Sequence, residues 1–151
     1  MRLEDELKSK GFASEQTKAV INVMFTASFL HAKISAVLRP FGLSHEQFNV
    51  LRILKGQYPN SVAQKDILHR MVDRSSNLTR ILLKLKEKEL VVVERSSCDK
   101  REYEISLSGM ALDLLEKLDI VLKQQSSLSE LLSTSEAFHL NALLDKMRES
   151  M

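Results

Sequence analysis

The sequence contains few residues that cross-link or interrupt a chain. It has one cysteine, Cys98, and only 4 glycines and 2 prolines among 151 residues. A single cysteine cannot form an internal disulfide, and the scarcity of glycine and proline leaves little room for disorder. With 44% hydrophobic and 28% charged residues, the composition predicts an ordered, mostly α-helical protein. At this length, one compact domain is the simplest expectation.

Long apolar runs and secretion signals are also lacking. No apolar run approaches the roughly 18 residues that a membrane span needs. Residues 1–18 are mostly charged and polar, unlike the apolar core of a signal peptide. We therefore expect a cytoplasmic protein that does not associate with membranes.

The residue patterns of common enzyme and metal sites are missing too. There is no Ser-His-Asp order, catalytic carboxylate pair, P-loop or dinucleotide-binding glycine pattern. Four histidines lie on separate segments, with no cysteine or carboxylate at zinc-ligand spacing: His31, His45, His69 and His139. We expect these to be structural or surface residues, and we predict no enzymatic activity, no cofactor and no metal.

Positive charge is concentrated in the middle of the chain. Residues 64–101 hold 10 lysines and arginines against 6 aspartates and glutamates, a local charge of +4, whereas the whole chain carries only +2. Such an asymmetry is expected where one region faces phosphate, although chance also produces an excess of this size.

Apolar residues recur at helical spacing in six segments. We expect helices over residues 16–38, 44–54, 64–71, 77–88, 109–123 and 135–147. Pro40 and Gly42 should end the first helix, and Ser44 with Gln47 forms a capping box for the second. The expected caps of the later helices are Ser61, then Asp73, Ser75 or Ser76, and Ser135.

After Leu90 the apolar period changes from helical to two, which predicts strands over residues 90–95 and 103–107 around a turn at 96–100. Two helices, a basic helix and a hairpin, in this order, are the layout of a winged helix-turn-helix. A helix fits the major groove of DNA, and a basic hairpin can reach an adjacent minor groove. The fold class predicted is mainly α with a small β-hairpin wing, in which the fourth helix reads DNA.

Residues 43–115 resemble the MarR (multiple antibiotic resistance regulator) family. The matching residues are Ser76-Asn77-Leu78-Thr79-Arg80, Leu85, Leu90-Val91, Glu94-Arg95, Asp99-Lys100-Arg101 and Leu107-Ser108. The most specific feature is the Asp-x-Arg of the wing, placed after a Thr-Arg reading helix and a Leu-Val strand. The resemblance implies a homodimer on a near-palindromic site in double-stranded DNA. Dimerisation helices (residues 1–40 and 108–151) would flank a winged domain (41–107), and the apolar faces at both chain ends agree with this.

The resemblance also assigns DNA contacts. Ser75, Ser76, Asn77, Thr79 and Arg80 match the start of the recognition helix; arginine and asparagine can make bidentate base contacts, and Lys84 more naturally meets phosphate. In the wing, Arg101 matches the arginine that enters the groove, and Arg95 and Lys100 add to the contact. Asp99 is expected to pair with Arg95 or a neighbour and to hold the shape of the wing tip.

Three positions depart from the family pattern. Glu89 stands where the family usually has glycine between the recognition helix and the Leu-Val strand, Ala63 stands where threonine or serine usually caps the third helix, and Ser108-Gly109 replaces a Thr-x-x-Gly. A glycine would adopt a left-handed turn easily, so Glu89 leaves the turn geometry open.

Plainer interpretations stand beside these. The face with Arg80, Lys84 and Lys88 could be a solvated surface, and residues 99–101 could be an ordinary polar turn. Cys98 lies beside basic residues that could activate its thiol, but the family's thiol sensors carry the reactive cysteine near the first helix, and residues 1–40 contain none. We therefore favour an ordinary exposed thiol.

Members of the family often bind small aromatic or anionic effectors between the dimer arms and the winged domain. Met24, His31, Arg39 and Phe48 are our candidates for lining such a pocket. The function predicted is a ligand-responsive repressor that binds specific DNA as a homodimer. Two alternatives stay open: a winged-helix protein-interaction module without DNA binding, and a small-molecule enzyme or carrier.

Overall fold

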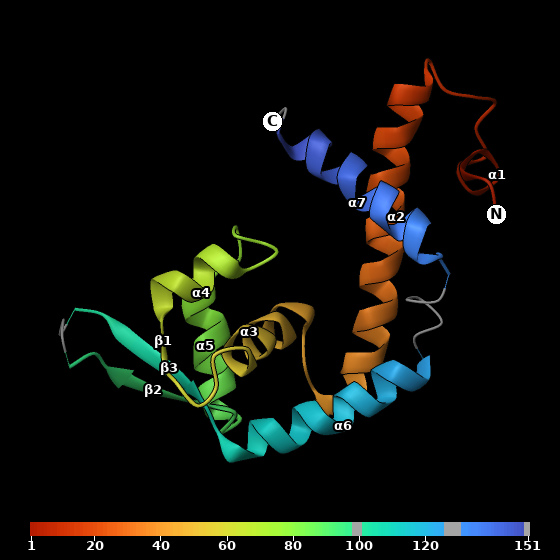
Figure 1. Ribbon diagram of the computed structural model, residues 1–151. Helices are drawn as coiled ribbons and strands as arrows, with labels where there is room; N and C mark the ends of the chain where they lie inside the picture. Colours follow the sequence, from red (N-terminus) through yellow and green to blue (C-terminus); the bar gives the residue numbers. More distant parts are fainter. Residues whose placement is uncertain (98–100, 126–130, 150–151) are drawn as a thin grey trace. The chain divides into compact units, whose positions relative to one another are not determined.

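The computed structural model describes residues 1–97, 101–125 and 131–149 and divides into two compact units, Met1–Asp113 and Leu114–Met151. The elements in chain order are α1 (Leu3–Leu7), α2 (Glu15–Leu38), η1 (Arg39–Phe41), α3 (His45–Lys55), β1 (Val62–Ala63), α4 (Gln64–Arg70), α5 (Leu78–Glu87), β2 (Val91–Arg95), β3 (Tyr103–Leu107), α6 (Gly109–Gln125) and α7 (Thr134–Glu149) (Figure 1). The mainly α fold with a small β wing is confirmed.

The core of the first unit lies where α3 packs against α4, α5 and β3. Its fully buried side chains are large and aliphatic, so this region gains most from removing apolar surface from water. They include Leu51, Leu54, Ile67, Leu85 and Ile105. The recognition helix α5 and the sheet are therefore fixed to the same core.

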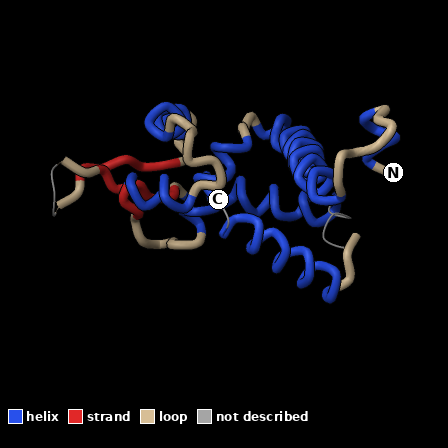
Figure 2. Tube along the Cα trace, turned by 90° about the horizontal axis from the view of Figure 1, so that it is seen from above, coloured by secondary structure: helices blue, strands red, loops and turns tan. Residues whose placement is uncertain are grey.

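The sheet has three antiparallel strands in the order β1–β3–β2. Val91 pairs with Leu107 and Arg95 with Tyr103 along the predicted hairpin, and Val62 pairs with Ile105 where β1 joins it. Strand β1 was not predicted, because two residues are too few to reveal a period of two. The β2–β3 hairpin extends beyond helices α3–α5 (Figures 1 and 2).

Two helix boundaries follow the local signals in the sequence. Helix α2 gives way to η1, with Pro40 at its start and Gly42 in a left-handed conformation at φ 66° after it. Ser44 and Gln47 form the predicted capping box of α3, with both hydrogen bonds at 3.2 Å.

Three predicted caps are wrong. Helix α4 is preceded by Ala63 without a side-chain cap, and Ser61 instead donates to Glu104. Asn77 caps α5, accepting a hydrogen bond from the Arg80 N–H, while Asp73 accepts hydrogen bonds from the two serines that follow it. Helix α7 begins with a reciprocal pair between Ser133 and Glu136 rather than with Ser135. At α4 and α5 the serines near the boundary bond to a carboxylate instead, and at α7 the cap lies two residues earlier than predicted.

Glu89 adopts the left-handed conformation that the family assigns to glycine, with φ 58°. Its N–H donates to the Lys86 carbonyl at 2.9 Å, and the Leu90 N–H donates to the Leu85 carbonyl at 3.0 Å. These two bonds are those of a Schellman motif, which satisfies the last carbonyls of a helix. The turn after α5 therefore keeps its geometry, at the conformational cost of a side chain in this region.

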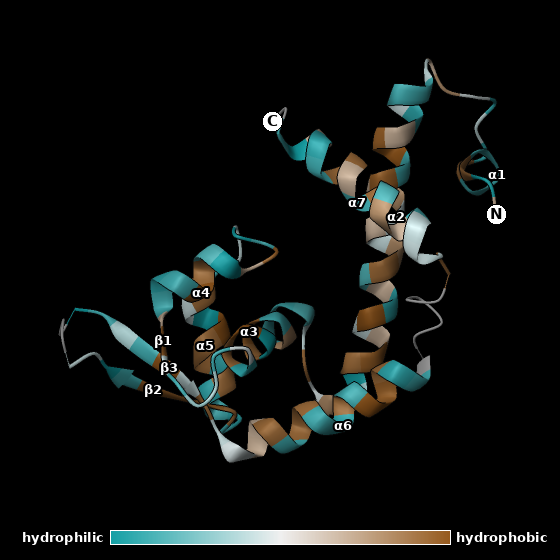
Figure 3. Ribbon diagram, viewed as in Figure 1, coloured by the Kyte–Doolittle hydropathy of each residue, from teal (hydrophilic) through white to brown (hydrophobic). Residues whose placement is uncertain are grey.

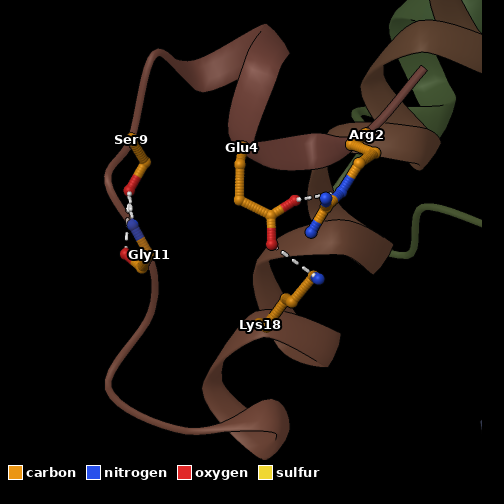
Figure 4. A network of polar contacts seen from close by, with 5 residues as sticks. All are labelled: Arg2, Glu4, Ser9, Gly11 and Lys18. Carbon is orange, nitrogen blue, oxygen red and sulfur yellow. Dashed lines mark hydrogen bonds and ion pairs between the residues drawn. The ribbon is translucent and has the colours of Figure 1, made fainter.

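The short helix α1 was not predicted. Glu4 accepts a hydrogen bond from Lys18 of α2 at 2.6 Å and lies 3.8 Å from the Arg2 guanidinium (Figure 4). The Lys18 hydrogen bond is the main reason that the pKa of Glu4 is lowered. Leu3 is buried, so one apolar contact and one ion pair hold the N-terminal segment.

Helix α2 is more apolar than the sequence analysis expected of any segment. The segment Glu15–Phe41 spans 27 residues, and its most apolar window has a mean hydropathy of 1.4, so by length and composition it is able to cross a membrane. Figure 3 shows hydrophobic residues along much of this helix. Core helices of soluble proteins and signal sequences meet the same criterion, so one such helix is weak evidence for a span.

The second unit contains most of α6 and all of α7. Leu115 and Leu118 of α6 are fully buried. In contrast, α7 keeps large apolar side chains in solvent, with Phe138 72% exposed and Leu143 61% exposed. Exposed apolar side chains mark an interaction surface where they form a contiguous patch.

Candidate nucleic-acid interface

The start of α5 and the base of the wing surround one hollow of about 600 Å³. Its lining comes from α4, the α4–α5 loop, α5 and the wing: Gln64, Lys65, Leu68, Arg74, Ser76, Leu78, Thr79, Arg101, Glu102 and Tyr103. Of the predicted DNA contacts, the structure thus brings Ser76 and Thr79 together with Arg101, which is 25 positions from Ser76 in the sequence. We call this the wing hollow.

A second hollow, of about 420 Å³, lies on the other side of the start of α5. We call it the α3 hollow, because it is lined by residues of α3 and α5 and of the segments just before them: Ser44, Glu46, Gln47, Ser76, Asn77, Arg80, Ile81 and Lys84. The predicted recognition residues therefore divide into two groups: Thr79 lies with the wing, Arg80 and Lys84 lie near α3, and Ser76 lines both hollows.

The loop before α5 is held by Asp73. One carboxylate oxygen accepts from the N–H and the hydroxyl of Ser75 at 2.9 and 2.6 Å, and the other accepts from the Ser76 hydroxyl at 3.1 Å. The Ser75 hydroxyl, followed by its backbone N–H, lowers the pKa of Asp73. Both serine hydroxyls therefore already donate a hydrogen bond within the protein, to Asp73, before any ligand binds.

Asn77 and Thr79 are positioned by hydrogen bonds. The Asn77 side-chain oxygen accepts from the Arg80 N–H at 3.1 Å, so its NH2 group is the part left to meet a ligand. The Thr79 hydroxyl accepts from the Gln64 amide at 3.2 Å. Gln64 was not among the predicted site residues, because its approach to Thr79 depends on how α4 packs beside α5.

Lys88 does not share the role suggested by its place in the sequence. Its ammonium donates to the Gly42 carbonyl and to the Gln47 side-chain oxygen, both near the start of α3. The face predicted from helical spacing therefore ends at Lys84, while Lys88 links two helices.

The wing contributes unequally to the two hollows. Arg101 lines the wing hollow, whereas Arg95 is exposed, pairs with Tyr103 in the ladder and lines neither hollow. The predictions for Cys98, Asp99 and Lys100 lie outside the described residues.

A third hollow, of about 700 Å³, lies between α2, α3 and α5 and includes two of the four candidate effector residues, His31 and Arg39. Met24 and Phe48 are not part of its lining. His45 also lines it, with its ring centre 4.6 Å from that of His31. Burial, and then the nearby His31, lower the pKa of His45. The sequence placed these histidines on separate segments, and only the packing of α2 beside α3 pairs them.

The family model for MarR matches residues 43–103, which run from just before α3 to the first residue of β3. Residues 43–103 therefore form a MarR-family domain. This family consists of transcription regulators and not of enzymes.

Several solved structures share the fold of this protein. A MarR-like transcription regulator from Bacillus cereus ATCC 10987 is 19% identical with a TM-score of 0.75, covering 91% of this chain and 98% of that one. A MarR transcription factor from Planctomyces limnophilus is 26% identical with a TM-score of 0.68 and the same coverage. MepR from S. aureus, solved with DNA, is 22% identical with a TM-score of 0.75, covering 88% of this chain and 97% of that one. A comparison with curated proteins finds no match.

Proposed function

We propose that this MarR-family protein regulates transcription by binding specific sequences in duplex DNA through α5 and the β2–β3 wing. The observation that carries the proposal is the wing hollow, where Ser76 and Thr79 of the recognition region lie with Arg101 of the wing. Similar solved structures support it, since MepR and AbfR were each determined with DNA.

Each predicted contact then takes a distinct role. Asn77 and Arg80 read base edges in the major groove, because their amide and guanidinium groups can bond two base atoms at once. Lys84 and the serine and threonine hydroxyls position the helix on phosphate. Arg101 enters the minor groove, with Arg95 and Lys100 on the flanking backbone and Asp99 holding the wing tip.

The active form proposed is a homodimer. Met24 of α2 is 67% exposed, and Val20, Phe29, Phe138 and Leu143 are also large apolar side chains in solvent. Residues 1–40 and 108–151 would bury these side chains against a second copy, since a soluble chain rarely leaves such surfaces uncovered. The same burial accounts for the apolar character of α2 without a membrane, and we place the protein in the cytoplasm.

An effector is proposed to act through the third hollow. Its volume of about 700 Å³ falls within the range of roughly 300–1,000 Å³ typical of small-molecule sites, and Arg39 with the histidine pair suits an aromatic or anionic ligand. Such an effector would bind more tightly to a dimer whose recognition helices are wrongly spaced for DNA than to the DNA-binding dimer. The ratio of its affinities for these two conformations sets how far it lowers DNA occupancy. The protein would then act as a ligand-responsive repressor.

DNA binding is tested by fluorescence anisotropy on duplexes selected from the source genome, at several salt concentrations. A dimer that neutralises about 6–10 phosphates should lose roughly 1,000- to 100,000-fold in affinity between 50 and 200 mM salt. The substitutions Arg80→Ala and Arg101→Ala should weaken binding, while Lys86→Ala, on α5 but in neither DNA-facing hollow, is the control. Absence of salt-dependent binding would reject the proposal in favour of a winged-helix protein-interaction module.

The dimer is tested separately by light scattering of the purified protein. Met24→Lys places a charge on the exposed apolar face of α2 and should shift the mass from two chains to one. A wild-type protein that is monomeric at the concentrations used for DNA binding would contradict the homodimer.

A further inference from the structure

Glu104 connects segments on both sides of the sheet. It lies in the central strand β3, on the face opposite to that of the buried Ile105. One of its carboxylate oxygens accepts from the Ser61 hydroxyl at 2.6 Å, and the other accepts from the Ser96 hydroxyl at 2.9 Å. Ser61 precedes β1 and Ser96 follows β2, so one side chain links the two outer edges of the sheet.

Sheet stability alone does not account for a carboxylate at this position. The direct partner of Glu104 on β2 is Glu94, and like charges directly opposite each other destabilise a strand pair. The hydroxyls of Ser61 and then Ser96 lower the pKa of Glu104 and thus favour its charged form. The two serine hydroxyls therefore favour an acceptor side chain at this position, and the charged form of the carboxyl over the protonated one.

The neighbouring residues hold the same part of the wing. The Glu102 carboxylate forms an ion pair with Lys65 of α4 at 2.6 Å. The backbone carbonyl of Glu102 accepts a hydrogen bond from the Ser96 N–H at 2.9 Å. Ser96 is only 7% exposed. The side chains of Glu102 and Glu104, both close to Arg101 in the sequence, thus hold the base of the wing.

These bonds matter because the core holds only one end of the hairpin: Val91, Ile105 and Leu107 are buried, whereas Glu94, Arg95 and Tyr103 toward the tip are exposed. The hairpin β2–β3 extends beyond the helices (Figures 1 and 2), and β1 pairs with it only through Val62 and Ala63. A two-stranded hairpin is only marginally stable by itself. Side chains that connect it to α4 and to the segment before β1 therefore have a large share in setting its direction.

We propose that Glu104 is a positioning residue for Arg101: by joining Ser61 and Ser96, it fixes the direction in which the wing leaves the α4–α5 region and so keeps Arg101 beside Thr79 in the wing hollow. This inference rests on the proposed DNA-binding function. It assigns Glu104 no contact with DNA of its own.

A double-mutant cycle of Glu104→Ala and Arg101→Ala, measured by anisotropy on one selected duplex, tests the proposal. Glu104→Ala alone should weaken binding by about 5- to 100-fold, the range expected for one lost groove contact. With Arg101 already replaced, the same change should cost less than about twofold, because residues that act through each other are not additive. Additive effects, or no effect of Glu104→Ala, would overturn the proposal.

Matched variants separate positioning from general destabilisation. Ser61→Ala removes the link to the β1 side and should reproduce part of the loss, whereas Glu104→Gln keeps an acceptor oxygen and should restore part of the affinity. Glu94→Ala is the control, because it removes a carboxylate from the same strand pair without touching either serine bond. If Glu94→Ala costs as much as Glu104→Ala, the effect is one of charge and the proposal fails.

Hydrogen exchange without DNA gives an independent measurement. Glu104→Ala should speed exchange of the Ser96 amide while leaving the amides of Val50 and Leu51 in α3 protected. Faster exchange throughout the domain, or none at Ser96, would reject the positioning role. Failure of the wild-type protein to bind any duplex would instead overturn the proposed function, so the two failures are distinguishable.

Discussion

The ammonium of Lys88, just after α5, donates a hydrogen bond to the side-chain oxygen of Gln47, in the first turn of α3, at 2.9 Å. The same oxygen accepts from the Ser44 N–H in the capping box, and Gln47 is only 5% exposed. A buried amide oxygen thus receives two donors from separate parts of the chain. This bond joins the end of the recognition helix to the helix before it, and so contributes to the angle between them.

Replacing Lys88 with methionine should lower the free energy of unfolding by about 1 kcal/mol, because the hydrogen bonds of its ammonium to Gln47 and Gly42 are lost while the length of the side chain is kept. Urea denaturation followed by circular dichroism measures this change. Lys86→Met, on the exposed side of the same helix, should change stability by less than about 0.5 kcal/mol. Equal effects of the two substitutions would mean that the contacts of Lys88 with Gln47 and Gly42 do not stabilise the fold.

Replacing Glu89 with glycine should raise the free energy of unfolding by about 0.5–1 kcal/mol. A φ of 58° raises the conformational energy of a residue with a side chain but not that of glycine. Removing this energy should outweigh the larger backbone entropy that glycine loses on folding. The reverse sign is expected for Lys86→Gly inside α5, which should cost up to about 1 kcal/mol. Thermal melting of both variants decides the matter, and a destabilised Glu89→Gly would refute the expectation.

Asn77 combines a cap with a candidate base contact, and two substitutions separate these roles. Asn77→Ser keeps a capping oxygen but removes the NH2 donor, so DNA affinity should fall by about 5- to 100-fold with little loss of stability. Asn77→Ala should reduce DNA binding and also cost about 1 kcal/mol of stability. Wild-type affinity in Asn77→Ser would exclude Asn77 as a base-reading residue.

His45 should make stability depend on pH below neutrality. Its pKa in the folded protein is lowered from 6.5 by burial and by the neighbouring His31, so the unfolded chain takes up the proton more readily. The contribution to stability is complete above about pH 6.5 and is lost as the pH falls through the folded pKa. Urea midpoints from pH 7.5 to 5.0 should therefore fall more for the wild-type protein than for His45→Gln.

The lowered carboxylate pKa values affect a different range. Glu46, whose pKa is lowered chiefly by the Ser44 hydrogen bond, and Asp73 lose their contribution only at more acidic pH, because both values start from 4.5 or below. Measurements above about pH 5 thus mainly report His45. Identical pH profiles for the wild-type protein and His45→Gln would contradict the prediction.

Local signals in the sequence predicted most of the elements correctly. The capping box at Ser44, the break at Pro40 and Gly42, and the change of period after Leu90 each depend on residues within one or two turns of each other. The caps at Ser61 and Ser135 were wrong. The Ser61 hydroxyl donates to Glu104 from another segment, and α7 is capped by the neighbouring Ser133 in place of Ser135.

The sequence predicted most of the residues of the candidate interface, but only part of their arrangement in space. The motif around Asn77 and Arg80 named the start of the recognition helix, but Gln64 was missed because it reaches Thr79 across 15 positions of sequence. Lys88, which helical spacing groups with Lys84, instead bonds to residues near the start of α3. Helical spacing predicts which residues share a face of a helix, but not which other segment that face contacts.

The sequence by itself determined the order of the elements, the family and the basic character of the region that we propose to face DNA. These properties follow from side-chain periodicity and short motifs, which act within single elements. Only the tertiary structure decided that His31 lies beside His45, that Glu104 joins Ser61 to Ser96, and that Thr79 and Arg101 share one hollow. Such pairings need segments far apart in the chain to pack against a common core, and no local pattern encodes which side chains then meet.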